Sequence, residues 1–436
     1  MPGIGYVSLN QLNVQLPTFS FDESVCGMLF DYSQFESPFE SFILLEQHFN
    51  NDQVQLIHNL QEAEEMGLSS EFMNGVPYYH IKTFYDYIGG DAALYLMFAD
   101  CSGFNFEAIQ TIQCLANGRI FQLGVWTEQF LWRIGEDGNY AFTELLGNIE
   151  AQAEILSGAV GKSFCENLPL SIIVNACTSF VKNSDDGNVD YNQLPEALSL
   201  DFPKVSVILG QNGSDEVHAI QKQNHNYTPV GFLGHAIACL YLAPAETSLG
   251  SVEQFDLNKN DSVLEPELGF GRVGSDYYTP ITDINNFRRN ILSAKGYIIP
   301  TTYNAKEAGV FFSNDQTLSE HDFSSISINR IAHKCRRVIR SVMFPYINNN
   351  IEIDRTNGHV STIQGARIAD EIAISIDSIM VNKVGQNQIS GRYITVDDQN
   401  SILETDELYI NCLFVPVIST SAIEEREAYI LNEQSL

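Results

Sequence analysis

The chain has 436 residues, of which 44% are apolar and 18% are charged, and its formal net charge is −32. This length and apolar content suffice for two or three packed domains, and the composition excludes a disordered tail as the class of protein. The negative charge disfavours nucleic acid and anionic membranes as partners, because both would be repelled.

The first residues predict an extended N-terminal arm over residues 1–22. The opening MPGIGYVSLN has neither the basic nor the apolar part of a signal peptide, so we expect synthesis in the cytoplasm. In LNVQLP, Leu12, Val14 and Leu16 alternate with polar residues, which is typical of a half-buried strand. No nearby segment offers this strand an obvious partner.

Residues 23–290 predict an α/β domain. After an irregular, partly helical stretch, short apolar segments alternate with amphipathic ones. We expect strands at 93–100, 119–127, 170–176 and 203–211, and helices at 106–117, 143–164 and 231–243. This alternation is typical of a parallel sheet that helices cover on both faces. The longest apolar run, from Phe232, is too short to span a bilayer, so no direct membrane insertion is expected.

Residues 291–436 predict an α+β domain that ends in a strand arm. A strand is expected first, then a long helix, a second helix and two extended segments, at 295–303, 324–347, 363–382, 390–398 and 406–418. The fold class predicted for the whole chain is therefore α/β, with a parallel-sheet domain, a C-terminal α+β domain and extended arms at both ends.

The eight cysteines show no paired spacing. Several lie in apolar segments such as IACLYL, which favours small core residues in a reducing compartment.

Two loop motifs resemble ligand sites but lack essential parts. GFGRVG at 269–274 has the glycine spacing of a dinucleotide-binding loop, without a strand before it or a helix after it. The ligand positions of a calcium loop are occupied by Asp256, Asn258, Asn260 and Glu267. The turn position that requires glycine is Asp261, so we interpret this segment as an exposed turn and those four residues as weak candidates.

No other motif positions a nucleophile or a metal. We therefore expect no catalytic residues, no cofactor and no enzymatic activity.

One basic segment stands out in this acidic chain. Residues 330–340 contain five of the 23 Lys and Arg side chains, and no acidic residue occurs from 323 to 351. On a helix, one face carries Arg330, Lys334 and Arg337, with Arg336 and Arg340 beside it. A solvated face near a helix C-terminus would explain the pattern. The acidic remainder of the chain favours a contact with an acidic surface instead.

The C-terminal third contains the segments NRIAHKCRRVIRSVMFPYI, ISGRYITVDD and LYINCLFVPV, in that order. In these segments and in the order of the elements around them, it resembles the C-terminal domain of contractile tail sheath proteins of phages and phage-derived injection machines. Upstream, ALYLMFAD and GRIFQLGVW also resemble segments of sheath proteins.

The resemblance implies a structural subunit that polymerises as a helical sleeve around an inner tube and contracts to drive the tube through a target envelope. It implies a location in a phage tail or an injection particle. The implied partners are copies of the chain itself, the inner tube protein, and baseplate and tail terminator proteins.

The resemblance also assigns places to parts of the chain. It places the α/β domain outward and the C-terminal domain inward, against the tube. The basic face would then contact the tube or a neighbour, with Arg367 and Lys383 of the second helix as rivals. The arms that pass into neighbouring subunits would be the strand at 12–16 and the strand containing Leu408, Ile410, Cys412 and Phe414.

Two other functions stay open from the residues alone. One is a nucleotide-dependent enzyme built on the α/β domain, which would need a phosphate loop at the C-terminal end of a strand. The other is a calcium-binding surface protein that uses residues 256–267.

Overall fold

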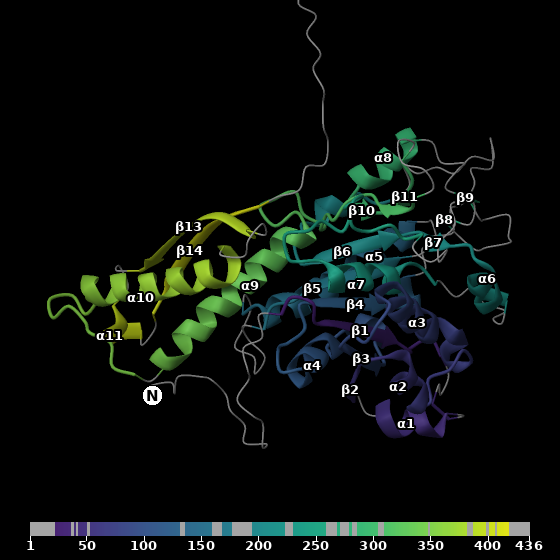
Figure 1. The fold of residues 1–436 in the computed structure, drawn as a ribbon, viewed down its shortest axis with the longest axis horizontal. Coiled ribbons are helices and arrows are strands. Elements are labelled where there is room, and N and C mark those ends of the chain that lie inside the picture. The colour runs from purple at the N-terminus through teal and green to yellow at the C-terminus, as the bar shows by residue number, and fades with distance from the viewer. Residues whose placement is uncertain are drawn as a thin grey trace, which may run out of the picture.

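The fold consists of a large α/β region and a smaller C-terminal unit, joined by one long helix (Figure 1). The computed structural model describes residues 22–35, 39–40, 42–49, 53–130, 136–158, 168–176, 194–222, 230–258, 268–270, 279–280, 286–303, 309–347, 349–381, 387–397, 401–405 and 408–417. The arm expected at 1–22 lies almost entirely outside these residues, and the strand at 12–16 lies wholly outside them.

The α/β region contains most of the strands. Its strands are β1 (Cys26–Asp31), β2 (Val54–Ile57), β3 (Leu94–Ala99), β4 (Gln122–Trp126), β5 (Ser171–Ala176), β6 (Val205–Leu209), β7 (Gln211–Asn212), β8 (Leu268–Phe270), β9 (Thr279–Pro280), β10 (Tyr297–Ile298), β11 (Pro300–Thr301) and β12 (Phe311–Phe312). Its helices are α1 (Ile43–Phe49), α2 (Leu60–Glu65), α3 (Val76–Ile88), α4 (Ala108–Leu115), α5 (Glu136–Leu156), α6 (Asp215–Lys222), α7 (Leu233–Leu242) and α8 (Asn286–Ala294).

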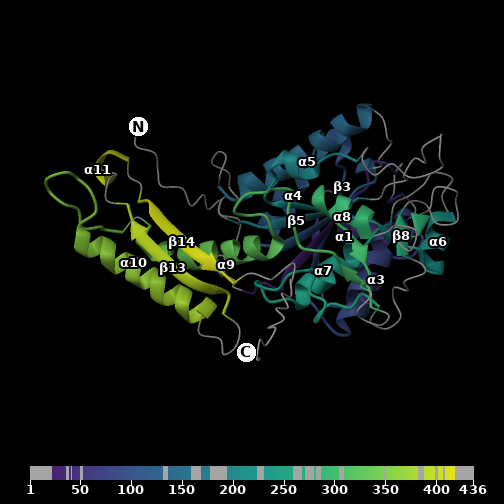
Figure 2. The same cartoon turned by 90° about the horizontal axis from the view of Figure 1, so that it is seen from above.

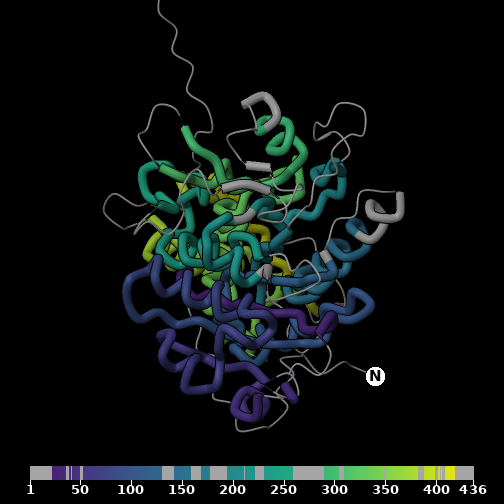
Figure 3. Tube along the Cα trace, turned by 90° about the vertical axis from the view of Figure 1, so that its right-hand side faces the viewer, coloured from purple at the N-terminus to yellow at the C-terminus, as the bar shows by residue number. Residues whose placement is uncertain are grey.

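Seven strands form the central sheet in the order β10-β6-β5-β4-β1-β3-β2. All neighbouring pairs are parallel except β2 with β3. Figure 3 shows the purple and blue N-terminal part of the chain below the teal and green part that follows it. The mostly parallel sheet confirms the predicted α/β class, since such sheets require helical crossovers between strands.

Helices cover both faces of the sheet, as seen from above in Figure 2. Helices α4 and α5 lie on one face, and α3 and α7 lie on the other. The strands are therefore shielded from solvent: every residue of β1, β3 and β5 is buried.

The C-terminal unit is built on α9 (Ile326–Met343), which continues as a short 3-10 turn at Phe344–Tyr346. It adds α10 (Thr362–Ile376), β13 (Ile389–Val396), α11 (Ile402–Thr405) and β14 (Ile410–Pro416). Strands β13 and β14 form a separate antiparallel hairpin. In Figure 1 this unit lies to the left of the sheet, and α9 runs between the two.

Packing divides the described residues into two apolar clusters. The larger extends to Ile326 and includes Tyr297 and Ile298 of β10, beyond the domain boundary expected at 290. The smaller contains one side of α9, α10 and the hairpin. The division therefore falls at α9, with its two ends in different clusters.

Among the described residues, the cysteines that form no disulfide are Cys26, Cys101, Cys239, Cys335 and Cys412. Cys114 is disulfide-bonded, so the expectation of reduced cysteines throughout is wrong for this residue.

None of the helices within the described ranges has the length and apolarity needed to cross a bilayer.

Candidate functional site

The candidate site is the junction around α9 and the hairpin that packs on it. Helix α9 begins at a defined cap, because the Ser325 hydroxyl accepts a hydrogen bond from the Ile328 amide at 3.2 Å. Ser327 donates its hydroxyl to the Asp315 carboxylate at 2.7 Å. These bonds fix where the helix starts and hence which face its basic side chains occupy.

That basic face is turned towards the edge of the sheet where the strands begin. In a parallel α/β fold each helix runs back against the strands, so α4, α5 and α7 all end at this edge. The C-terminal end of a helix exposes unsatisfied carbonyl groups and the negative end of the helix dipole. Cationic side chains on α9 are therefore placed opposite a collection of partial negative charges.

Arg330 is completely buried at the end of α7. Its guanidinium donates to the carbonyl oxygens of Leu240 at 3.0 Å and Ala243 at 2.9 Å, and to that of Glu23, just before β1, at 3.0 Å. Burial lowers the pKa of Arg330 from its ordinary value. The carbonyl ligands show that this arginine caps a helix inside its own chain.

Arg337 likewise binds backbone carbonyl groups, between the end of α4 and the start of β5. It donates to the carbonyl oxygens of Gly118 at 2.5 Å, Ile120 at 2.7 Å and Pro169 at 3.0 Å. Its guanidinium also stacks over the ring of Phe121 at 3.8 Å. Burial lowers the pKa of Arg337 to about 9.

Arg336 is more exposed and donates to the carbonyl oxygen of Ser157, directly after α5, at 2.9 Å. Three arginines of one helix thus contact the ends of three helices of the α/β region. These contacts lie between segments far apart in the sequence.

Lys334 completes the junction through an acidic partner. Its ammonium lies 2.7 Å from the Glu23 carboxylate, and the side chain of Lys334 is almost fully buried. The other carboxylate oxygen of Glu23 accepts from the Gln388 amide at 2.9 Å, at the start of the hairpin. Burial acts to raise the pKa of Glu23, but the Lys334 ammonium and these hydrogen bonds outweigh it, so the pKa lies below 4.5.

The structure corrects the expected role of the basic face. Arg330, Lys334 and Arg337 are buried against their own chain and have no surface to offer a tube or a neighbour. The cause is the orientation of the helix ends, which sequence periodicity does not report. Of the other candidates, Arg336 is exposed, Arg340 is half-buried, and Arg367 is exposed and paired with Glu371 at 3.4 Å. Lys383 lies outside the described residues.

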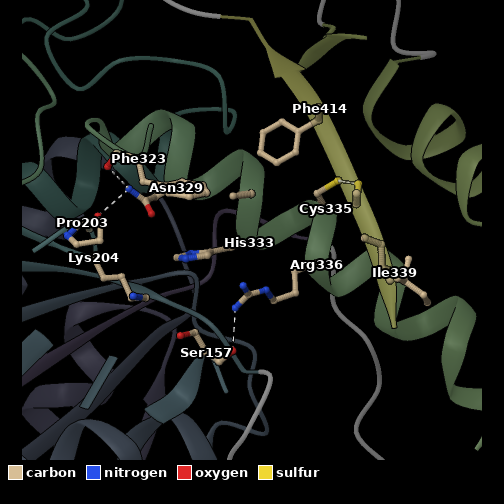
Figure 4. A pocket seen from close by; sticks show the side chains of 13 residues that line it. Ser157, Pro203, Lys204, Phe323, Asn329, His333, Cys335, Arg336, Ile339 and Phe414 are labelled. Atoms are coloured by element: carbon tan, nitrogen blue, oxygen red, sulfur yellow. Dashed lines mark hydrogen bonds between the residues drawn. The ribbon is translucent and has the colours of Figure 1, made fainter. Parts of the chain in front are cut away.

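A cavity of about 430 Å³ lies between α9, the sheet and β14. Its lining includes Lys204, His333, Cys335, Arg336 and Phe414, most of which Figure 4 shows directed towards the same space. Lys204 is paired with Glu150 at 3.3 Å, and burial lowers the pKa of His333 far below its ordinary value. At neutral pH the His333 imidazole is therefore uncharged.

The hairpin has one covered and one open face. The candidate arm residues Leu408, Ile410, Cys412 and Phe414 pack partly on the smaller apolar cluster. On the other face Tyr393 and Leu413, which lie opposite each other, are 64% and 66% exposed, and Val415 is 58% exposed. Among the described residues, neither β13 nor β14 has a second neighbouring strand. In the described chain the late strand pairs within its own subunit.

Neither loop motif forms a ligand site in the part of it that the structure describes. Asp256 uses a carboxylate oxygen to accept from the Asn258 amide at 3.0 Å and the Val310 amide at 3.1 Å, which makes it a turn-stabilising residue. Asn260 and Glu267 lie outside the described residues, and within those residues no acidic or thiol cluster could hold a metal. Gly269 lies in an antiparallel strand pair with β7, which is not the context of a dinucleotide loop.

The C-terminal ends of the central strands, where α/β enzymes bind nucleotides, are joined by a buried carboxylate. Asp31 at the end of β1 accepts from the Cys101 amide at 3.0 Å, the Thr127 hydroxyl at 2.7 Å and the Gln129 amide at 2.6 Å. These partners lie just after β3 and β4, so the carboxylate holds the ends of three neighbouring strands together. No sequence pattern indicates this network, because its members are single polar residues that follow separate strands.

Comparison of the complete fold with solved structures gives full-length likenesses. One is a chain in the anti-feeding prophage (AFP) baseplate, with a TM-score of 0.54, 9% identity and coverage of 99% of this chain and 100% of that one. Another is a chain of the PVC sheath complex of an extracellular contractile injection system in the contracted state, with a TM-score of 0.55, 9% identity and coverage of 100% and 99%. At this identity the likeness establishes a shared fold. No family model and no curated protein matches the sequence.

Proposed function

We propose that this chain is a non-enzymatic structural subunit of a contractile particle, which assembles with copies of itself as a helical sleeve around an inner tube. On contraction the sleeve drives the tube through a target envelope. The observation that carries this proposal is the likeness of fold over the whole chain to subunits of two injection-system assemblies, one of them a sheath complex. The sheath-like segments of the C-terminal third support it independently.

The hairpin is the place where neighbouring copies would join. Strands β13 and β14 carry apolar side chains on the face turned away from α9 and α10, and among the described residues neither strand has a second neighbouring strand. The alternating strand pattern at 12–16 could add to one edge of the hairpin of a neighbour by backbone hydrogen bonds. Each such bond contributes roughly 1 kcal/mol net, so a short arm holds firmly.

Strand exchange suits a contracting sleeve for a physical reason. Subunits must slide and rotate while staying joined, and a backbone ladder on a tether allows the side-chain surfaces to change partners. Contacts between copies that do not close on themselves generate a helical filament, as a sleeve requires.

The remaining partners follow from this arrangement. The C-terminal unit would face the inner tube, with exposed Arg336 and Arg367 available for weak, salt-screened contacts, and the α/β region would face outward. Baseplate and tail terminator proteins would contact the two ends of the sleeve. The particle is a phage tail or an injection particle, made in a bacterial cytoplasm.

Electron microscopy of the purified chain, alone and with its tube protein, tests the proposal. We expect sleeves from the native chain, and only monomers from a chain lacking residues 1–18. Leu413→Asp would place a charge on the open face of the hairpin and prevent assembly, while the monomer stays folded. Ile43→Asp is the matched control, since Ile43 is 67% exposed at the first position of α1, where an acid suits the helix dipole.

Persistent monomers of the native chain with the tube protein would contradict the sleeve. Normal sleeves from the chain lacking residues 1–18 would contradict strand exchange. Equal assembly of Leu413→Asp and Ile43→Asp would remove the hairpin from the interface.

A further inference from the structure

Two cysteine side chains meet where the hairpin packs on α9. The sulfur atoms of Cys335 and Cys412 lie 3.9 Å apart, although the residues are 77 positions apart in the sequence. Cys335 is buried in the middle of α9, and Cys412 is partly exposed in the middle of β14. A disulfide requires about 2.0 Å between the sulfur atoms, a difference that small side-chain rotations supply.

Small molecules have a route to this pair. Both cysteines line the cavity of about 430 Å³, together with Arg336, which is exposed to solvent. Figure 4 shows Cys335 beside β14 at one side of this cavity. Cys26, Cys101 and Cys239 are buried, form no disulfide and do not line this cavity.

The surroundings divide the roles between the two sulfur atoms. The hydrogen bond from Cys335 lowers the pKa of the Cys412 thiol, burial opposes this, and the Arg392 guanidinium adds to the lowering. The same hydrogen bond and burial raise the pKa of Cys335. Cys412 is also the more exposed of the two residues, so a peroxide reaches its sulfur first, and a thiolate there is the nucleophile in thiol oxidation. By contrast, burial raises the pKa of Cys26 to about 12.

We infer that Cys335 and Cys412 form a redox-modification site, at which a hydroperoxide converts the two thiols into a disulfide. The Cys412 sulfur attacks a peroxide oxygen, the O–O bond breaks, and Cys412 becomes a sulfenic acid while the other oxygen leaves as water or an alcohol. The Cys335 sulfur then attacks the Cys412 sulfur. The S–S bond forms, the S–O bond breaks, and the hydroxyl leaves as water with the proton of Cys335.

The disulfide would fix the hairpin to a helix that is itself held on the α/β region. Arg330 and Arg337 flank Cys335 on α9 and bind carbonyl groups of that region. Oxidation would therefore tie the last strand to the whole molecule and restrict its separation from α9. This inference does not depend on the proposed function.

Mass spectrometry of the full-length chain tests the site. The reduced protein is treated with hydrogen peroxide, its remaining thiols are alkylated, and it is digested. We expect a cross-linked peptide pair joining Cys335 to Cys412, while Cys101 and Cys239 in the same digest stay alkylated. The Tm of the oxidised protein should rise and return to its starting value on reduction.

Two variants separate the roles. Cys335→Ser should accumulate a sulfenic acid at Cys412 that dimedone traps, and Cys412→Ser should leave Cys335 unmodified. Alkylation of Cys335 and Cys412 to the same extent as Cys101 and Cys239 after oxidation would overturn the inference. Disulfides between separate chains through Cys412 would overturn it as well.

Discussion

The central sheet and the C-terminal hairpin differ in how much of their surface the chain itself covers. All six residues of β1 are buried, whereas every second residue of β14 is exposed. The sheet has helices on both faces, and the hairpin has α9 and α10 on one. The comparison shows that one region is completed within a single chain, while the other leaves an apolar face and strand edges available to another.

The boundary between the two regions is polar rather than apolar. Buried arginines of α9 bind carbonyl groups at the ends of α4 and α7, and Lys334 pairs with Glu23. Groups of this kind bind in defined geometries, so they fix the orientation of the two regions as well as holding them together. Substitutions at this boundary should therefore change stability by a different amount than substitutions within either region.

The largest expected effect comes from Arg330→Ala. It would leave the carbonyl groups of Leu240, Ala243 and Glu23 buried without this donor, and would open a cavity. We expect the free energy of unfolding in urea to fall by about 4 kcal/mol. Arg367→Ala, at an exposed ion pair of α10, is the control and should cost less than about 0.5 kcal/mol. Similar losses for both would mean that the boundary is not held by buried cations.

A smaller effect is expected for Glu23→Gln. Lys334 would keep a hydrogen-bond acceptor but lose its buried counter-charge, which should cost about 2 kcal/mol at neutral pH. Because the folded pKa of Glu23 lies below 4.5, its ionised form stabilises the protein above pH 4.5, and this is lost as the pH falls. Urea unfolding at several pH values should therefore show a weaker loss of stability below pH 4.5 in the variant. An identical pH profile would contradict the assigned role of Glu23.

The smallest effect concerns a buried histidine of the sheet region. Burial lowers the pKa of His235 from 6.5 to about 3, and neither ring nitrogen has a partner among the described residues. Below pH 6.5 the His235 imidazole is protonated in the unfolded chain but stays neutral in the folded chain. The free energy of unfolding therefore falls as the pH drops from 6.5 towards 3.

Replacing the imidazole by His235→Leu should reduce this slope by up to about 1.4 kcal/mol per pH unit, measured by urea unfolding between pH 6 and 4. Unchanged slopes would show that acid does not weaken the sheet region through this group.

The sequence predicted most strands of the central sheet but missed β1 and the edge strand β2. The segments around β3, β4, β5 and β6 were recognised as apolar runs between helical patterns. Strand β1 was missed, because it contains Gly27 and follows polar residues. A Cβ at Gly27 would lie 3.0 Å from a side-chain carbon of Ile120, so close packing, rather than strand propensity, requires the glycine there.

The sequence by itself determined the α/β class, the position and amphipathic faces of α9, and the hairpin segments, because periodicity and apolar content act locally along the chain. Only the tertiary structure decided what the basic face contacts. Its partners are backbone carbonyl groups, which every residue carries and no sequence pattern distinguishes, and they became a binding site for arginine when three helices ended at the same edge of the sheet.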